Sequence, residues 1–459
     1  MSGPDPAAPR AGARFSLTTA TALVIANMVG TGVFTSLGFQ VVGLSSGLAL
    51  ILLWIVGGMI ALFGALTYSE AGVLFPRSGG EYHFLTKMFH PALGFLAGWI
   101  SFLVGFAAPV AAASMALGRY LGSALALPER PPVFSFLQTS SWIAIAVVAL
   151  LTAIHSLDKM IGAKFQNVIT LFKVVFIFVI IVLGLTLGKS TGLSFAPTAR
   201  AFRDILSPAF AVSMFFVTFS YSGWNAAAYV AGEIDRPARN LPRSLITGTL
   251  FVIAIYVLLN FVFLRTVPLG EMSGKIEIGY IFGGRVFGPE GGRIMGGVIA
   301  FLLLSSISAM IIAGPRISRV IGEDYRLFRR LGRTTRKDIP AAAIVTQGLL
   351  SVVYIVTSTF DQVIVFIGFT LNLFTFLTVL GVMIMRRKRP DLPRPYKTVG
   401  YPVVPILFLL IHVYILVYGL LYRPKESLAG IGITLAGLGV YALSKKYEKY
   451  GDTSLNSPN

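Results

Sequence analysis

The first long apolar segment of the chain contains, near its middle, the stretch Asn27-Met28-Val29-Gly30-Thr31-Gly32-Val33-Phe34. Two glycines around a threonine weaken a helix. A bilayer offers no water to satisfy the backbone groups that such a weakening frees, so a break at this depth must line a cavity or contact a ligand. The stretch therefore predicts a broken membrane helix whose amide and carbonyl groups bind a small zwitterionic solute.

The whole chain has the composition of an integral membrane protein. Of its 459 residues, 55% are hydrophobic and 12% are charged, whereas charged residues make up about a quarter of a soluble domain. Apolar runs of about 20 residues recur from end to end. They predict an all-α fold of about twelve membrane helices, at residues 17–44, 47–75, 91–126, 140–157, 163–188, 205–231, 243–266, 292–321, 340–357, 360–386, 402–421 and 427–444.

Composition also excludes several chemistries. The chain has no cysteine, and its four histidines show no metal-ligand spacing, so we expect neither a metal site nor a cofactor. The net charge is +19, and most Lys and Arg residues fall in loops on the N-terminal side of the predicted spans. The positive-inside rule then places both termini in the cytoplasm. The basic loops 316–337 and 386–397 are expected to contact membrane lipid and no nucleic acid.

Four later segments follow one another in a recognisable order. The sequence resembles the amino acid permeases of the amino acid–polyamine–organocation family over nearly its whole length, and the sixth-helix segment resembles that of the L-type transporters. The segments are Tyr68-Ser69-Glu70-Ala71-Gly72-Val73-Leu74-Phe75-Pro76-Arg77-Ser78-Gly79-Gly80-Glu81-Tyr82, Phe219-Ser220-Tyr221-Ser222-Gly223-Trp224-Asn225, Glu233-Ile234-Asp235-Arg236-Pro237-Ala238-Arg239-Asn240-Leu241-Pro242-Arg243 and Arg389-Pro390-Asp391-Leu392-Pro393-Arg394-Pro395-Tyr396.

The resemblance implies the LeuT-type fold, with two inverted five-helix repeats and broken first and sixth helices. In this chain the repeats correspond to about 15–188 and 203–386, and the additional helices to 402–444, within one transporter domain, 1–459. The residues support this independently, because Gly30-Thr31-Gly32 and Ser222-Gly223 are both small-residue breaks inside predicted spans.

The resemblance also implies a substrate site at the two breaks. Backbone groups at Thr31 and Gly32 would bind a carboxylate, with Gly30 beside them in the site. The carbonyls of Met28, Phe219 and Ser222 would bind an ammonium group. Phe219 would close over the substrate as a gate. Asn225 would either contact the substrate or hold the next helical turn. The alternative for the glycines is close packing between helices.

Lys173 is the one ionisable residue deep within a predicted span. It lies about 10 residues, or about 15 Å, from the nearer end of its helix, too far to reach the headgroups easily. In sodium-independent members of the family that the chain resembles, a fifth-helix lysine replaces a sodium ion. We therefore expect Lys173 to couple the Asn27–Gly30 break to Ser305, Ser306 or Ser308 on the eighth span. Three glutamates near span ends, Glu70, Glu81 and Glu233, are expected to pair with Arg77, Arg236 or Arg316. The alternative is that some of them belong to an inner gate.

The leading hypothesis is a sodium-independent secondary transporter of neutral L-amino acids, working by alternating access as a proton symporter or an exchanger. A polyamine or organic-cation carrier of the same fold is the first alternative, and it would need an acidic side chain in the pocket. A channel would need a continuous polar path, and an enzyme would need a nucleophile and base. No enzyme activity is expected. The resemblance implies a stand-alone protein of the bacterial inner membrane, because without cysteine it forms no disulfide-linked subunit.

Overall fold

The computed structural model describes residues 14–77, 79–131, 135–157, 163–335 and 339–453. The helices in its first part are α1 (Leu17–Met28), α2 (Gly32–Thr35), α3 (Leu37–Gln40), α4 (Gly47–Leu74), α5 (Glu81–Met88), α6 (Pro91–Ile100), the π-helical segment η1 (Ser101–Phe106), α7 (Ala107–Ala124), α8 (Thr139–Leu157) and α9 (Ala163–Thr186). Those in its second part are α10 (Ala199–Ile205), α11 (Pro208–Ser220), the 3-10 helix η2 (Ala226–Glu233), α12 (Pro237–Thr266), α13 (Leu269–Met272), α14 (Ile278–Asp324), η3 (Arg326–Phe328), α15 (Arg329–Gly332), α16 (Ala341–Thr357), α17 (Phe360–Lys388), α18 (Val403–Tyr422) and α19 (Pro424–Thr453).

Within these described residues, ten helical segments are long and apolar enough to cross a membrane. The pair α10 and α11, bent by 64°, makes an eleventh, and α16 is a shorter apolar helix. The prediction of an all-α, multi-pass membrane protein is confirmed. Each of the twelve predicted spans overlaps a helix, although α14 begins at Ile278, well before the predicted span 292–321. The number of crossings and the inverted repeat stay predictions.

The first helical segment is interrupted where the glycines predict it. Helix α1 begins after Ser16, whose hydroxyl caps the helix by accepting a hydrogen bond from the Thr19 N–H at 3.2 Å. It ends at Met28, because Val29 leaves the helical conformation (φ −76°, ψ 87°). Helical structure resumes at Gly32. The backbone groups at this interruption therefore have no partners within a continuous helix.

A second interruption follows α11. The helix ends at Ser220, and the chain then forms a turn in which Gly223 has a φ of +96°, a left-handed value that favours glycine. The chain continues as the tight 3-10 helix η2. The break predicted at Ser222-Gly223 is confirmed.

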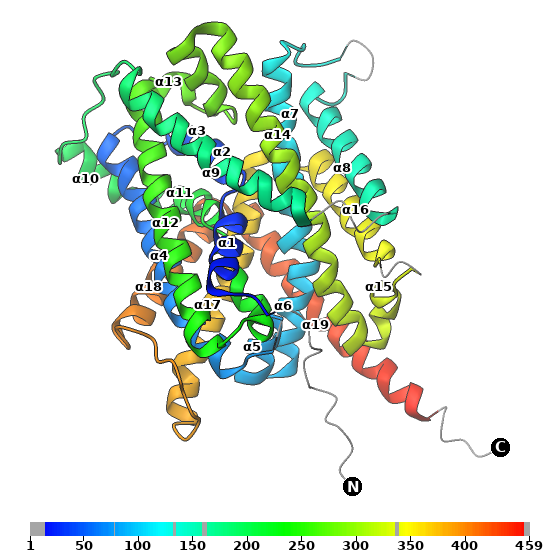
Figure 1. The fold of residues 1–459 in the computed structure, drawn as a ribbon. Coiled ribbons are helices and arrows are strands. Elements are labelled where there is room, and N and C mark those ends of the chain that lie inside the picture. The colour runs from blue at the N-terminus through cyan, green and yellow to red at the C-terminus, as the bar shows by residue number, and fades with distance from the viewer. Residues whose placement is uncertain (1–13, 78, 132–134, 158–162, 336–338, 454–459) are drawn as a thin grey trace.

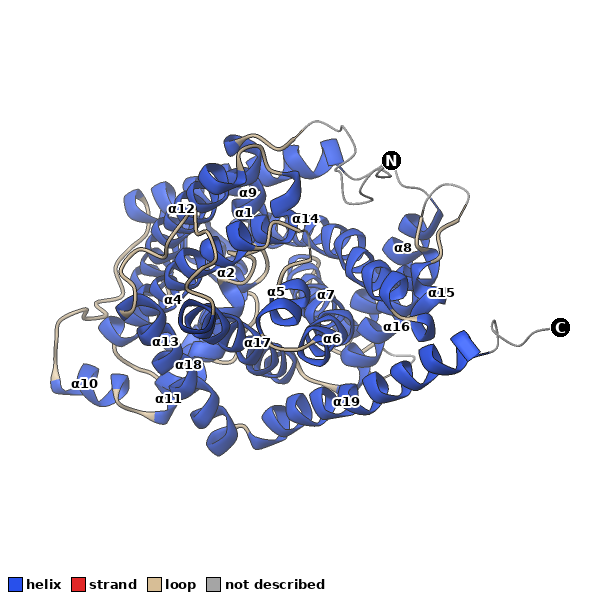
Figure 2. Cartoon of the chain, turned by 90° about the horizontal axis from the view of Figure 1, so that it is seen from below, coloured by secondary structure: helices blue, strands red, loops and turns tan. Residues whose placement is uncertain are grey.

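The helices pack as two groups. The first helix group contains α1, α4, α11, η2 and α12, and the second contains α7, α8, α14 and α16. Figure 2 shows α4 and α12 on one side of the molecule, α8 and α16 on the other, and α5 and α17 between them. Along the bundle, α13 lies at one end and α5 lies at the other, near the loop that joins α17 to α18 (Figure 1). These are called the α13 end and the α5 end below.

Candidate functional site

The two broken segments touch at their breaks. A Cβ atom on Gly223 would lie 2.8 Å from the backbone oxygen of Asn27, and a Cβ atom on Gly32 would lie 2.5 Å from Ser220 Cα. Both distances are too short for a side chain, so Gly223 and Gly32 permit a close approach of the two backbones. Gly30 differs, because its Cβ would meet no atom closer than 3.9 Å. Gly32 thus serves the close packing weighed as an alternative above, whereas a Cβ atom at Gly30 would make only an ordinary contact.

Two buried serines join the broken segments. Ser36 Oγ lies 2.9 Å from Ser220 Oγ, and Ser36 also donates a hydrogen bond to the Phe216 carbonyl at 3.2 Å. Both side chains are at most 2% exposed. These bonds hold the segment after the first break against α11.

Thr31 lies at the centre of the first break and is 3% exposed. Its Oγ1 atom has no hydrogen-bond partner within the described part of the chain. Buried hydroxyl groups are nearly always hydrogen-bonded. A bound polar group would therefore complete this position.

Two of the three carbonyls expected to bind an ammonium group, those of Met28 and Phe219, are held in place by other donors. The Tyr256 hydroxyl donates to the Met28 carbonyl at 2.6 Å, and the Ser222 N–H donates to the Phe219 carbonyl at 3.0 Å. Each carbonyl oxygen can accept a second hydrogen bond. Sequence reasoning missed Tyr256, which comes from α12 and carries no motif that marks it.

Phe219 and Asn225 flank the second break. Phe219 is 7% exposed at the end of α11, a buried position that agrees with both a gate and an ordinary core aromatic. The Asn225 side-chain nitrogen donates to Glu81 Oε1 at 2.8 Å. The structure therefore gives Asn225 a partner on α5, which the sequence did not predict.

Glu81 accepts three hydrogen bonds from neutral groups and is 6% exposed. Its donors are Asn225, the Tyr68 hydroxyl at 3.0 Å and the Tyr229 hydroxyl. No Arg or Lys of the described chain forms an ion pair with Glu81. The expected pairing with Arg77 or Arg236 is therefore wrong for this carboxylate, and the side chain of Arg316 lies outside the described residues. In the sequence, the one feature that marked Glu81 was an acidic side chain inside the family-like segment from Tyr68 to Tyr82.

Glu70 has different partners from those predicted. Its carboxylate binds Arg386 at 2.5 Å and 2.8 Å, and Arg394 lies 3.5 Å away. The backbone N–H of Thr398 adds a bond of 2.8 Å. The expected partners Arg77 and Arg236 are thus wrong for Glu70, and the side chain of Arg316 again lies outside the described residues. Glu70 instead anchors the basic loop between α17 and α18 to α4.

His83, two residues beyond Glu81 on α5, is electrically neutral at physiological pH. Burial, together with the nearby positive charges of Arg77 and Lys87, lowers the pKa of His83 to about 4. His83 therefore supplies no positive charge to the neighbouring carboxylate.

Lys173 is 3% exposed on α9, and its Nζ donates to Ser306 Oγ on α14 at 2.7 Å. Of the three serines considered, Ser306 is the partner that the structure brings to Lys173. Ser308 instead lies 2.8 Å from His155 Nε2, and Ser305 is buried on the same helix. The described residues include no hydrogen bond between Lys173 and the Asn27–Gly30 break. The lysine joins α9 to the second helix group.

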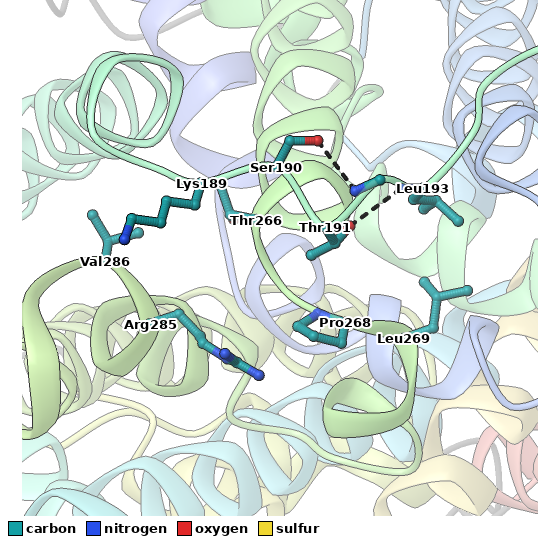
Figure 3. Close-up of a pocket in the computed structure, with 10 residues that line it drawn as sticks. Lys189, Ser190, Thr191, Leu193, Thr266, Pro268, Leu269, Arg285 and Val286 are labelled. Carbon is teal, nitrogen blue, oxygen red and sulfur yellow. Dashed lines mark hydrogen bonds between the residues drawn. The ribbon is translucent and has the colours of Figure 1, made fainter.

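A pocket of about 470 Å³ lies at the α13 end, between the loop 189–193, α13 and the start of α14. Figure 3 shows Lys189 extending towards Val286, while Arg285 reaches beneath Pro268. Arg285 binds Glu271 through two hydrogen bonds. The pocket contains none of the predicted site residues, so it is separate from the two breaks.

Comparison with known proteins identifies the family. Residues 15–442 match the model of the amino acid permease family. The b(0,+)-type amino acid transporter 1 of Mus musculus is 26% identical over 434 residues, which cover 94% of this chain and 87% of the relative. The large neutral amino acids transporter small subunit 2 of Homo sapiens is 29% identical over 432 residues, which cover 93% of this chain and 79% of the relative.

Proposed function

Because this chain belongs to the amino acid permease family, we propose that it is a secondary active transporter of neutral L-amino acids. It works by sodium-independent alternating access, as a proton symporter or an exchanger. The observation that carries the proposal is the contact between two broken helices around Thr31, whose buried hydroxyl has no partner among the described residues. The relatives named above are amino acid transporters, which supports the same substrate class.

The breaks offer complementary groups to the two ends of an amino acid. The carboxylate binds the backbone N–H groups of Thr31 and Gly32 and the Thr31 hydroxyl, beside Gly30, where a Cβ atom would have room. The ammonium group binds the carbonyls of Met28, Phe219 and Ser222. Each charged end loses its water in the membrane interior, so each needs such replacement hydrogen bonds. Phe219 closes over the bound substrate as a gate.

A neutral substrate side chain suits the charges near the breaks. Glu81 reaches Asn225, but three donors already occupy its carboxylate. Lys173 is directed to Ser306 on α14. Among the described residues, a dianionic side chain would have no free cationic partner near the breaks. A cationic side chain would meet only a carboxylate that three hydrogen bonds already stabilise, and this argues against a polyamine carrier.

Sodium independence rests on Lys173. Its ammonium group, bonded to Ser306, supplies the positive charge that a sodium ion would otherwise bring to the eighth span. Ser305 and Ser308 lie on the same helix, and we include them with Lys173 and Ser306 in the group of residues proposed to couple α9 to α14.

The proposed orientation places the α5 end in the cytoplasm, with both termini, in the inner membrane of a bacterium. The basic loops between α14 and α16 and between α17 and α18 support this side, since cytoplasmic loops are rich in Lys and Arg. We propose two inverted repeats, at about 15–188 and 203–386, followed by the helices within 402–444. Without cysteine, the chain has no disulfide-linked subunit.

Counterflow in liposomes tests the proposed function. Liposomes that contain the purified protein are preloaded with an unlabelled neutral amino acid, and sodium is replaced by choline. They are expected to accumulate radiolabelled leucine or alanine. Arginine and putrescine should fail to exchange. Exchange of putrescine alone would favour the polyamine carrier, non-saturable flux would favour a channel, and chemical conversion of the solute would indicate an enzyme.

A further inference from the structure

The carboxylate of Glu81 lies where the second break meets two other elements. Its donors come from α4 (Tyr68), from the turn after α11 (Asn225) and from η2 (Tyr229). All three belong to the first helix group or to its second break. One buried side chain on α5 therefore holds the segment after the second break against α4.

These hydrogen bonds depend on the negative charge of Glu81. A buried carboxylate is costly unless its oxygens are hydrogen-bonded, and bonds to an ionised acceptor are about twice as strong as neutral ones. Within the described part of the chain, the charged groups nearest along α5 and its preceding loop are Arg77 and Lys87, and neither pairs with Glu81. The carboxylate is thus stabilised chiefly by the two phenols and the Asn225 amide.

The next residue, Tyr82, binds the second helix group. Its hydroxyl donates to Asp324 at the end of α14. Consecutive residues of α5 therefore bind the two helix groups at the same end of the bundle. Figure 2 shows α5 lying between the groups, as these contacts require.

We infer that Glu81 is a positioning residue for transport: it orients Asn225 at the second break and holds the α5 end of the site closed. Because Glu81 binds the Asn225 nitrogen, the amide oxygen of Asn225 is left to accept a hydrogen bond from the substrate ammonium, in addition to the carbonyls of the proposed site. Release of substrate at the α5 end requires the bonds from Asn225 and Tyr229 to break. This inference rests on the proposed transport function.

The absence of cysteine from the sequence allows a direct test. Ala226→Cys places one thiol immediately after Asn225. Its rate of labelling by a membrane-impermeant maleimide, applied from the α5 end of reconstituted protein, reports how often that end opens. The measurement needs no transport activity, so it can fail or succeed independently of the proposed function.

Glu81→Gln keeps the size of the side chain and removes its charge. Loss of about 1.4 kcal/mol from the closed state is a tenfold change in equilibrium, so labelling should become about tenfold faster. Tyr229→Phe, which removes one donor, should act in the same direction with a smaller effect. It also serves as the second variant if Glu81→Gln folds poorly.

The matched control is Glu323→Gln, which removes an exposed carboxylate at the end of α14 that pairs only with Arg319 among the described residues. Its labelling rate should equal that of the parent protein. In transport assays, Glu81→Gln should raise the KM measured from the α13 end more than the KM from the α5 end, because a larger share of the protein is then open at the α5 end. Equal labelling rates in Glu81→Gln, Tyr229→Phe and the control would overturn the inference.

Discussion

The Tyr256 hydroxyl lies 2.6 Å from the carbonyl oxygen of Met28, so a side chain of α12 holds the last turn of α1 at the first break. The Tyr256 ring also packs against Trp54 and Tyr221, with ring centroids 5.9 Å and 5.2 Å away. The position of the Met28 carbonyl is thus determined by helices that lie far away in the sequence. In the proposed site, that carbonyl faces the substrate ammonium.

Tyr256→Phe removes this hydrogen bond and keeps the ring contacts. Loss of a hydrogen bond worth about 1 kcal/mol should raise the KM for exchange about fivefold, with little change in melting temperature. The KM is read from the concentration dependence of exchange in liposomes. Tyr354→Phe is the control, because the Tyr354 hydroxyl also donates to a carbonyl, that of Leu103 at 3.2 Å, but away from the breaks. The account fails here if both variants show the same KM.

The two glycines of the first break should respond differently to alanine. Gly32→Ala puts a methyl group against Ser220 and should destabilise the protein by about 1–3 kcal/mol, because the site is already close-packed. The methyl group of Gly30→Ala would lie no closer than 3.9 Å to its nearest neighbour beyond the adjacent residues, so the melting temperature should stay near the parent value. The same methyl group enters the space proposed for the substrate and should weaken exchange. Thermal unfolding in detergent and exchange in liposomes separate the two effects. Parent-like exchange by Gly30→Leu would show that the substrate binds elsewhere.

Lys173→Met removes the positive charge between α9 and α14 and keeps an apolar side chain of similar length. Since hydrogen bonds to charged groups contribute about 1.5–3 kcal/mol, exchange should fall by about tenfold or more. Ser306→Ala should reduce exchange in the same direction. Lys189→Met changes an exposed lysine and serves as the control. Unchanged exchange and unchanged pH dependence in Lys173→Met would remove the lysine from the mechanism.

The buried His83 should make stability depend on pH. Its pKa of about 4 in the folded protein is below the ordinary value of 6.5. As the pH falls from about 6.5 towards 4, the unfolded chain binds a proton that the folded protein does not, so the folded state loses stability. The melting temperature in detergent should therefore drop between pH 7 and pH 5, and it should drop less in His83→Gln. An equal drop in melting temperature in the parent protein and in His83→Gln would show that the buried His83 does not cause the pH dependence.

The sequence was sufficient to predict the helical membrane fold and both breaks. Long apolar runs identify membrane helices because the bilayer sets their length, and glycine inside such a run marks a weak point. Lys173 could be found for a similar reason, since one charge in an apolar helix is conspicuous. The sequence could not show which of Ser305, Ser306 and Ser308 is its partner, because the serine that faces Lys173 depends on how α14 is rotated about its axis.

The side chains that position the site were harder to predict. Tyr256 and Ser36 resemble many other residues of apolar helices, and their contacts depend on how distant helices pack. The expectation that Glu81 would pair with an arginine used charge alone. In the structure, two phenols and an amide surround the carboxylate of Glu81. Asn225 and Tyr229 lie far from Glu81 in the sequence, so residue spacing could not predict this arrangement.

A structure of the protein with a bound neutral amino acid tests the central claim most directly. The account predicts the substrate between the two breaks, with its carboxylate at the N–H groups of Thr31 and Gly32 and at the Thr31 hydroxyl. The ammonium group should lie at the carbonyls of Met28, Phe219 and Ser222. Substrate density found only in the pocket beside Lys189 and Arg285, with the breaks unaltered and unliganded, would contradict the account.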